Sequence, residues 1–101
     1  THDWLVDLGR EKGRRVVVGF AAEVENVAEN ALSKCKAKNL DFIVANDVSQ
    51  SGVGFASEEN AAVVVHADGR QEALPRMSKM RMAAEILDRV AALLKERAPQ
   101  S

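Results

Sequence analysis

Apolar residues recur along the chain in stripes and runs whose spacing predicts alternating helices and strands. Residues 3–12 carry the first stripe and are predicted to form a short helix, which Gly13 closes in the left-handed conformation. The apolar face of this helix consists of Trp4, Leu5 and Leu8. Residues 16–20 are an unbroken apolar run, which is typical of a strand covered on both faces.

A longer helical stripe follows and leads into a second buried strand. Over residues 22–37 the apolar positions repeat at helical spacing, and Asn39 is placed to cap the C-terminus of this helix. The stripe consists of Val24, Val27, Ala28, Ala31, Leu32 and Cys35. Residues 41–46 are again apolar. A strand, a helix and a strand with tight connections predict a βαβ unit, whose two strands are parallel.

The next part of the chain predicts a β-hairpin. A loop over residues 47–60, a strand over residues 61–66 and a return strand over residues 70–74 are expected in this order. The dipeptide Asp68-Gly69 between the strands favours a type I′ turn. The return strand is expected to stop at Pro75, because proline cannot donate to a ladder of hydrogen bonds.

Residues 78–96 are predicted to form the last helix. Its expected buried stripe consists of Met80, Ala83, Ala84, Leu87, Val90, Ala91 and Leu94. The order of elements predicts an α/β fold, a Rossmann-like three-layer fragment in which a parallel βαβ unit is followed by a C-terminal β-hairpin and helix.

Length and composition limit the classes of function. The 101 residues allow one domain, spanning 1–101. A net charge of -1 and only four aromatic side chains argue against nucleic acid as a partner, and no apolar run is long enough to span a membrane. The single cysteine excludes a disulfide within the chain, so we expect a cytoplasmic protein. The chain starts without Met, which predicts a piece of a longer protein.

The βαβ unit predicts where a ligand binds. In open parallel sheets, ligands bind beyond the carboxyl ends of the strands, which here are Gly19-Phe20 and Asn46-Asp47. Gly19 either lets a ligand approach the backbone or relieves packing. Asp47 either holds hydrated Mg²⁺ beside phosphates or caps the following turn. The two glycines of the loop over residues 49–55 can present amides to an anion, although a plain surface loop explains them equally well.

Two groups of lysines are candidates for anion binding. Lys34, Lys36 and Lys38 complement the dipole at the C-terminus of the second helix, yet Lys34 and Lys38 share a face from which one lysine can reach a partner's ligand. Lys79 follows the expected N-cap Ser78, where a cation opposes the helix dipole unless an anion is bound. Cys35, on the apolar stripe, is expected in the core.

The segments in this order resemble the C-terminal part of phosphopantothenoylcysteine synthetase. The resemblance covers residues 3–95 and rests on VGFAAE (18–23), the lysine cluster before Asn39-Leu40-Asp41, IVANDV (43–48), Gly54-Phe55 with Asn60, and Leu74-Pro75 followed by Ser78-Lys79. It implies a ligase that joins 4′-phosphopantothenate to cysteine with CTP and Mg²⁺ through an acyl-cytidylate, and that acts as a homodimer. In bacteria, FMN belongs to a separate decarboxylase domain fused to this ligase, and that domain is not present here.

The resemblance also implies roles for single residues. Lys34 matches the lysine used in catalysis, where a placed cation stabilises charge on the reacting phosphorus. Asp47 is the candidate metal ligand. The implied nucleotide-binding residues are Val18, Gly19, Phe20, Asn26, Asn46, Val53, Gly54, Phe55, Ala56 and Lys79.

Two departures from the family pattern leave an alternative open. Val24 stands where the family usually has Thr, and the upstream half of the domain, which supplies a Gly/Ser-rich nucleotide segment and an asparagine, is absent. The chain is therefore expected to be an incomplete fragment that is inactive alone. The alternative is a nucleotide-binding or regulatory module of the same fold without catalysis. A dinucleotide oxidoreductase is disfavoured because GxGxxG is missing.

Overall fold

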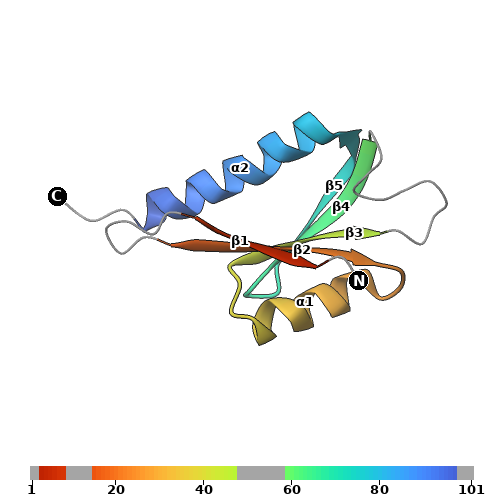
Figure 1. Ribbon diagram of the computed structural model, residues 1–101, viewed down its shortest axis with the longest axis horizontal. Coiled ribbons are helices and arrows are strands. Elements are labelled where there is room, and N and C mark those ends of the chain that lie inside the picture. Colours follow the sequence, from red (N-terminus) through yellow and green to blue (C-terminus); the bar gives the residue numbers. More distant parts are fainter. Residues whose placement is uncertain (1–2, 9–14, 48–58, 98–101) are drawn as a thin grey trace.

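The computed structural model describes residues 3–8, 15–47 and 59–97, which form three layers (Figure 1). The elements are β1 (Trp4–Leu8), β2 (Val16–Glu23), α1 (Val27–Ala37), β3 (Phe42–Asp47), β4 (Glu59–His66), β5 (Gln71–Ser78) and α2 (Lys79–Glu96). The strands lie in the order β1-β2-β3-β4-β5, with β2 and β3 parallel and every other pair antiparallel. Helix α1 covers one face of the sheet and α2 the other. The predicted α/β fold, with its βαβ unit, hairpin and C-terminal helix, is confirmed.

The helix predicted over residues 3–12 is wrong. Trp4–Leu8 is an edge strand that pairs antiparallel with β2, and Trp4 stacks on its cross-strand partner Phe20 at 5.2 Å between ring centroids. Alternate side chains of this segment face the same side of the sheet, so its apolar spacing fits a strand as well as a helix. The gain from pairing with β2 decided between them. Gly13 lies outside the described residues.

The boundary between the first parallel strand and its helix also differs from the prediction. Strand β2 continues to Glu23, and α1 begins only at Val27, so the helix predicted from residue 22 starts five residues later. Asn26 precedes the helix in the left-handed conformation, with φ of 48°. Val24 is 62% exposed outside the helix, so it is not part of the buried stripe. Inside the sheet, the segment after Phe20 gains ladder hydrogen bonds that a helix would forgo.

Asn39 ends α1 as predicted. Its φ of 55° is left-handed, its N–H donates to Lys36 O, and the N–H of Leu40 donates to Cys35 O at 2.9 Å. These bonds form a Schellman motif, which satisfies carbonyls that the helix end would otherwise leave open. The turn delivers Leu40 into the core and starts β3 next to β2.

The β-hairpin forms, but its turn and its second strand differ from the prediction. Gly69 has φ of 93°, whereas Asp68 has no positive φ, so the turn is not type I′. The N–H of Gly69 donates to His66 O and the N–H of His66 to Arg70 O, which closes a three-residue loop with glycine at its left-handed position. Strand β5 continues through Pro75 to Ser78. Proline is tolerated because β5 is an edge strand with a register shift at this point.

Helix α2 has nearly the predicted length but presents a different face to the sheet. Its core-facing residues are Met82, Ile86, Val90, Leu93 and Leu94. Met80 and Leu87, expected in the core, are exposed, as are Ala83, Ala84 and Ala91. The helix carries two apolar stripes, and helical spacing alone does not show which of them packs on the sheet.

The two faces of the sheet hold separate cores. On the α2 face, Phe42 is fully buried among valines of β2, β3 and β4; on the α1 face, Cys35 and Leu40 pack on β2 and β3. Gly19 belongs to the α1 face, where a Cβ atom would overlap Leu40 Cδ1 and lie 3.3 Å from Ile43 Cγ1. Close packing therefore accounts for a glycine at this position.

A polar network ties α2 to the hairpin and predicts sensitivity to acid. Arg89 donates to both carboxylate oxygens of Glu72, at 3.2 and 3.1 Å, and His66 Nε2 lies 2.6 Å from Glu72 Oε1. The hydrogen bonds from Arg89, and then that of His66, lower the pKa of Glu72 from 4.5 to about 2. A lowered carboxyl pKa stabilises the fold above the unfolded value, and this contribution is lost as pH falls from about 5 to about 2.

We expect the melting temperature of the chain to fall between pH 5 and pH 2, and to fall less steeply in Glu72→Gln. Thermal unfolding followed by circular dichroism across this range is the measurement. Glu59→Gln is the matched control, because Glu59 forms an exposed ion pair with Arg76. Parallel pH profiles for Glu72→Gln and the unsubstituted chain would contradict the assignment.

Candidate functional site

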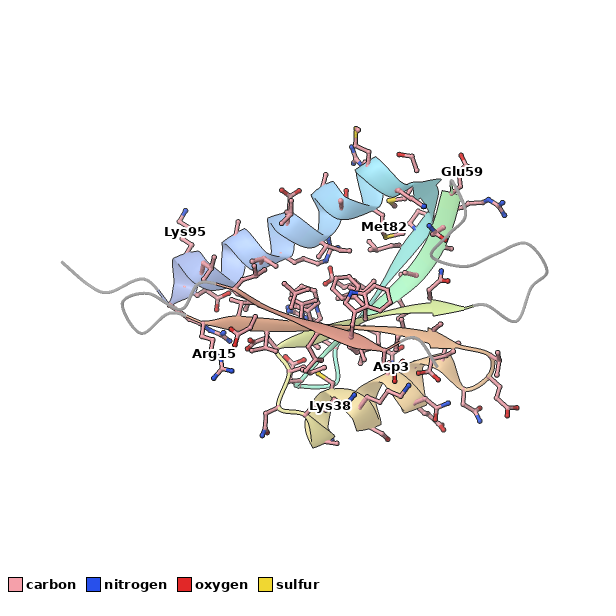
Figure 2. The ribbon with its side chains drawn as sticks, viewed as in Figure 1. Asp3, Arg15, Lys38, Glu59, Met82 and Lys95 are labelled. Carbon is pink, nitrogen blue, oxygen red and sulfur yellow. The ribbon has the colours of Figure 1, made fainter. Side chains whose placement is uncertain are left out.

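A cavity of about 230 Å³ lies between the sheet and the first turns of α2, near the carboxyl ends of β2 and β3. Its lining residues are Trp4, Phe20, Val44, Asn46, Asn60, Ala62, Lys79, Met82, Ala83 and Ile86. In Figure 2, Met82 lies on the side of the sheet that α2 covers, and Asp3 lies on the side of α1. Three of the predicted nucleotide-binding residues, Phe20, Asn46 and Lys79, meet in this cavity.

Asn46 is a fully buried amide in the wall of the cavity. Its Nδ2 donates to Ala61 O at 2.7 Å, across to the neighbouring strand β4. Its Oδ1 is buried and accepts no hydrogen bond from any residue that the structure describes. Most buried polar atoms in native proteins have a partner, so an open acceptor beside a cavity points to a ligand.

Lys79 brings positive charge to the rim of the cavity. It is the first residue of α2, after the N-cap Ser78, whose Oγ accepts from the N–H of Arg81 at 3.1 Å. The first turn of α2 has no acidic residue, so Lys79 and Arg81 both oppose the positive end of the helix dipole. Arg81 pairs with Glu85 one turn later, at 3.0 Å. An anion at this helix end would relieve the conflict at Lys79.

Lys34 lies on the other face of the sheet. Its Nζ is 2.7 Å from Asp3 Oδ2 and 2.7 Å from Glu23 Oε2. Partial burial works against the charged form, but the hydrogen bonds to Asp3 and Glu23 outweigh it and raise the pKa of Lys34. The structure therefore separates the two predicted lysines, since α1 carries Lys34 and the cavity on the α2 side contains Lys79.

The remaining predicted residues have different places. Val18 is buried in the core under α2, and Gly19 faces α1, so neither lines the cavity. Asn26 lies in the turn before α1, and Asp47 ends β3 in register with Glu23 of β2. Val53, Gly54, Phe55 and Ala56 lie outside the described residues. Roles for these residues in binding stay predictions.

Sequence reasoning missed several lining residues of the cavity. Trp4 was hidden because its segment was expected to be a helix, and Met82 because the stripe of α2 was placed on another face. Asn60 and Ala62 alternate with the residues of β4 that face α1, as period-two spacing allows. That alternation was a usable signal, because the strand was predicted correctly over most of its length.

The arrangement suits a flat group with a negatively charged tail. The stacked rings of Trp4 and Phe20 and the side chains of Met82 and Ile86 offer apolar contact, and Asn46 offers an acceptor. Lys79 at the rim can pair with a phosphate as a strongly hydrated point charge. The cavity can therefore bind an anionic ligand that carries a ring with a hydrogen-bond donor.

Metal-binding clusters and membrane helices were also considered. Over residues 3–8, 15–47 and 59–97, no group of three or more His, Cys, Asp and Glu side chains is placed to hold a metal ion. In the same ranges, neither helix combines the length and the apolar character that crossing a membrane requires.

An α/β domain with a ligand cavity at the carboxyl end of its parallel strands defines a broad class of ligand-binding folds. Residues 1–94 match the model of the DNA/pantothenate metabolism flavoprotein C-terminal domain, and the chain belongs to this family. It is 44% identical over 101 residues to the coenzyme A biosynthesis bifunctional protein CoaBC of Bacillus subtilis. It is 47% identical over 77 residues, or 76% of the chain, to the protein of the same name from Escherichia coli K12.

A solved structure shows the same fold. The C-terminal domain of a coenzyme A biosynthesis bifunctional protein CoaBC matches with a TM-score of 0.60 and 35% sequence identity over 76% of this chain. The matched region is 37% of that domain's chain. The present chain spans 25% of the Bacillus subtilis relative and 19% of the Escherichia coli relative, so it corresponds to a minor part of each.

Proposed function

We propose that this chain contributes the nucleotide-binding cavity of a coenzyme A biosynthesis ligase, which joins 4′-phosphopantothenate to cysteine at the expense of CTP. The observation that carries the proposal is the cavity itself, where the open acceptor of Asn46 lies among apolar walls and Lys79 stands at the rim. The family membership and the relatives named for coenzyme A biosynthesis support it.

The division of labour follows from the charges. Formation of an acyl-cytidylate builds negative charge on the reacting phosphorus, and placed cations stabilise that charge. Lys79 is the cation at the cavity, where it would hold a phosphate of the nucleotide. The groups that bind 4′-phosphopantothenate and cysteine would come largely from the parts of the relatives that this chain does not cover.

Lys34 enters the proposal through a second copy of the chain. It lies on the face of the sheet opposite to the cavity, so it cannot serve the cavity of its own chain without a large rearrangement. In a homodimer, Lys34 would leave Asp3 and Glu23 and reach the nucleotide held by the partner. The raised pKa keeps its ammonium group protonated, as this electrostatic role requires.

Mg²⁺ enters the proposal as an ion carried by the triphosphate. Magnesium usually keeps several waters and is held by one or two carboxylates together with substrate phosphates. The described residues do not form a protein cage for it, and no step is assigned to the metal here.

One observation favours the alternative, a nucleotide-binding module without catalysis. Lys34 is already neutralised by two carboxylates at 2.7 Å, an arrangement that a purely structural role explains. The two readings differ in what Lys34 does and agree on the cavity, so they are separated by turnover and not by nucleotide binding.

Substitution of Lys79 tests the cavity. We expect CTP with Mg²⁺ to shift the amide signals of Phe20, Asn46 and Lys79 in ¹H–¹⁵N spectra of the chain. Lys79→Ala should weaken CTP binding roughly threefold to tenfold, and this difference should shrink as salt screens the charge. Lys95→Ala, at the far end of α2, is the control. Equal binding by Lys79→Ala and Lys95→Ala, or shifts confined to residues away from the cavity, would contradict the proposal.

A further inference from the structure

The hydrogen bond of Asn46 to β4 fixes which atom its amide offers to a ligand. The bond to Ala61 O is 2.7 Å long, and a main-chain carbonyl can only accept, so the atom facing it must be the amide nitrogen. The other atom of the amide, Oδ1, is consequently an acceptor with its orientation set by the sheet. It is buried and unbonded among the described residues. A ligand that completes this site must therefore supply an N–H or O–H donor.

The walls of the cavity restrict that donor to a group on an apolar, flat framework. Trp4 and Phe20 are stacked with an interplanar angle of 12°, and Met82 and Ile86 complete the apolar lining. The acceptor is neutral, so it does not select for a cation. A heteroaromatic ring with an exocyclic amine meets both requirements, since its face is apolar and its edge donates.

We propose that Asn46 is the specificity-determining residue of the cavity, and that it accepts a hydrogen bond from the exocyclic amine of an aminopyrimidine base. A base with a carbonyl at the same position would place acceptor against acceptor and leave both unbonded, which a buried site penalises. The inference rests on the proposed function and adds to it a reason why cytosine is taken and uracil is refused.

The test combines a change in the ligand with a change in the protein. The dissociation constants of CTP, UTP and the pyrimidin-2-one riboside triphosphate, which lacks only the 4-amino group, are measured by amide-shift titration with Mg²⁺. The proteins are the unsubstituted chain, Asn46→Leu and the matched control Asn30→Leu, whose amide is exposed on α1. Deleting the amine should weaken binding roughly tenfold in the unsubstituted chain and in Asn30→Leu, but less than twofold in Asn46→Leu.

Each result decides the matter. An equal loss on amine deletion in all three proteins, or equal binding of CTP, UTP and the analogue to the unsubstituted chain, would overturn the role of Asn46 and leave the proposed function intact. If Asn46→Leu loses the dispersed spectrum of a folded chain, the ligand series on the unsubstituted chain still decides. Failure of all three triphosphates to bind would instead overturn the proposed function and this inference with it.

Discussion

Phe42→Ala should lower the free energy of unfolding by about 3–5 kcal/mol, which is a large part of the roughly 5–15 kcal/mol that stabilises a domain of this size. Phe42 has no exposed surface and lies on the central strand β3, with Val18 of β2 and His66 of β4 as its partners in register. Its ring lies 5.7 Å from the His66 ring. Removing it leaves a void that neither the sheet nor α2 can close without moving.

Urea denaturation followed by tryptophan fluorescence measures this loss. Leu5→Ala is the matched control, because Leu5 is 50% exposed on the edge strand β1 and should change stability by less than about 1 kcal/mol. Phe42→Leu should fall between the two, since it keeps most of the buried volume. Equal midpoints for Phe42→Ala and Leu5→Ala would show that the α2 face does not hold the main core.

Lys34→Gln should lower the rate of ligation about 100-fold, or roughly 2.7 kcal/mol of transition-state stabilisation, if Lys34 acts on the nucleotide of a partner copy. The test needs a protein with a complete ligase domain. A chimera serves, in which residues 1–101 replace the matching segment of the Bacillus subtilis relative. The chemistry is followed by release of pyrophosphate with saturating 4′-phosphopantothenate and cysteine.

The controls separate catalysis from structure. Lys36→Gln removes an exposed neighbouring charge of α1 and should leave turnover unchanged. Glu23→Gln removes one carboxylate partner of Lys34 and should not lower turnover, because it makes the ammonium group easier to release. Near-normal turnover of Lys34→Gln, together with a lowered melting temperature, would assign Lys34 to the ion pairs alone and favour the module without catalysis.

A mixed chimera tests whether the two copies share the site. Lys34→Gln and Lys79→Ala place their changes on opposite faces of one chain. If the sites are shared, mixing the two inactive chimeras should restore part of the activity, because one of the two cavities in a mixed dimer has both lysines. Activity that does not recover on mixing would contradict sharing between copies.

The elements that the sequence predicted well are those whose environment is written in local spacing. The apolar runs that became β2 and β3 are covered on both faces, and the stripe of α1 ends where Asn39 adopts a left-handed conformation. A strand, a helix and a strand with short connections leave one arrangement, a parallel pair. The position of the cavity near the carboxyl ends of that pair follows from the same topology.

Tertiary contacts decided the features for which local spacing allowed two answers. Trp4–Leu8 fits both a helix and a strand, and pairing with β2 selected the strand. Helix α2 has two apolar stripes, and the shape of the sheet beneath selected the one that contains Val90 over the one that contains Leu87. Pro75 stops a strand in isolation, but not on an edge where its missing N–H faces no partner.

For the site, the sequence by itself named Phe20, Asn46, Lys79 and Lys34 as candidates, because their residue types and their places beside predicted strand and helix ends suit anion binding. It could not show that three of them meet in one cavity while Lys34 lies across the sheet with Asp3 and Glu23. The side of a sheet on which a residue falls depends on the register of every strand between, and one residue of shift reverses it. That long-range geometry also left Asn46 Oδ1 without a partner among the described residues, a fact that no pattern of residues along the chain contains.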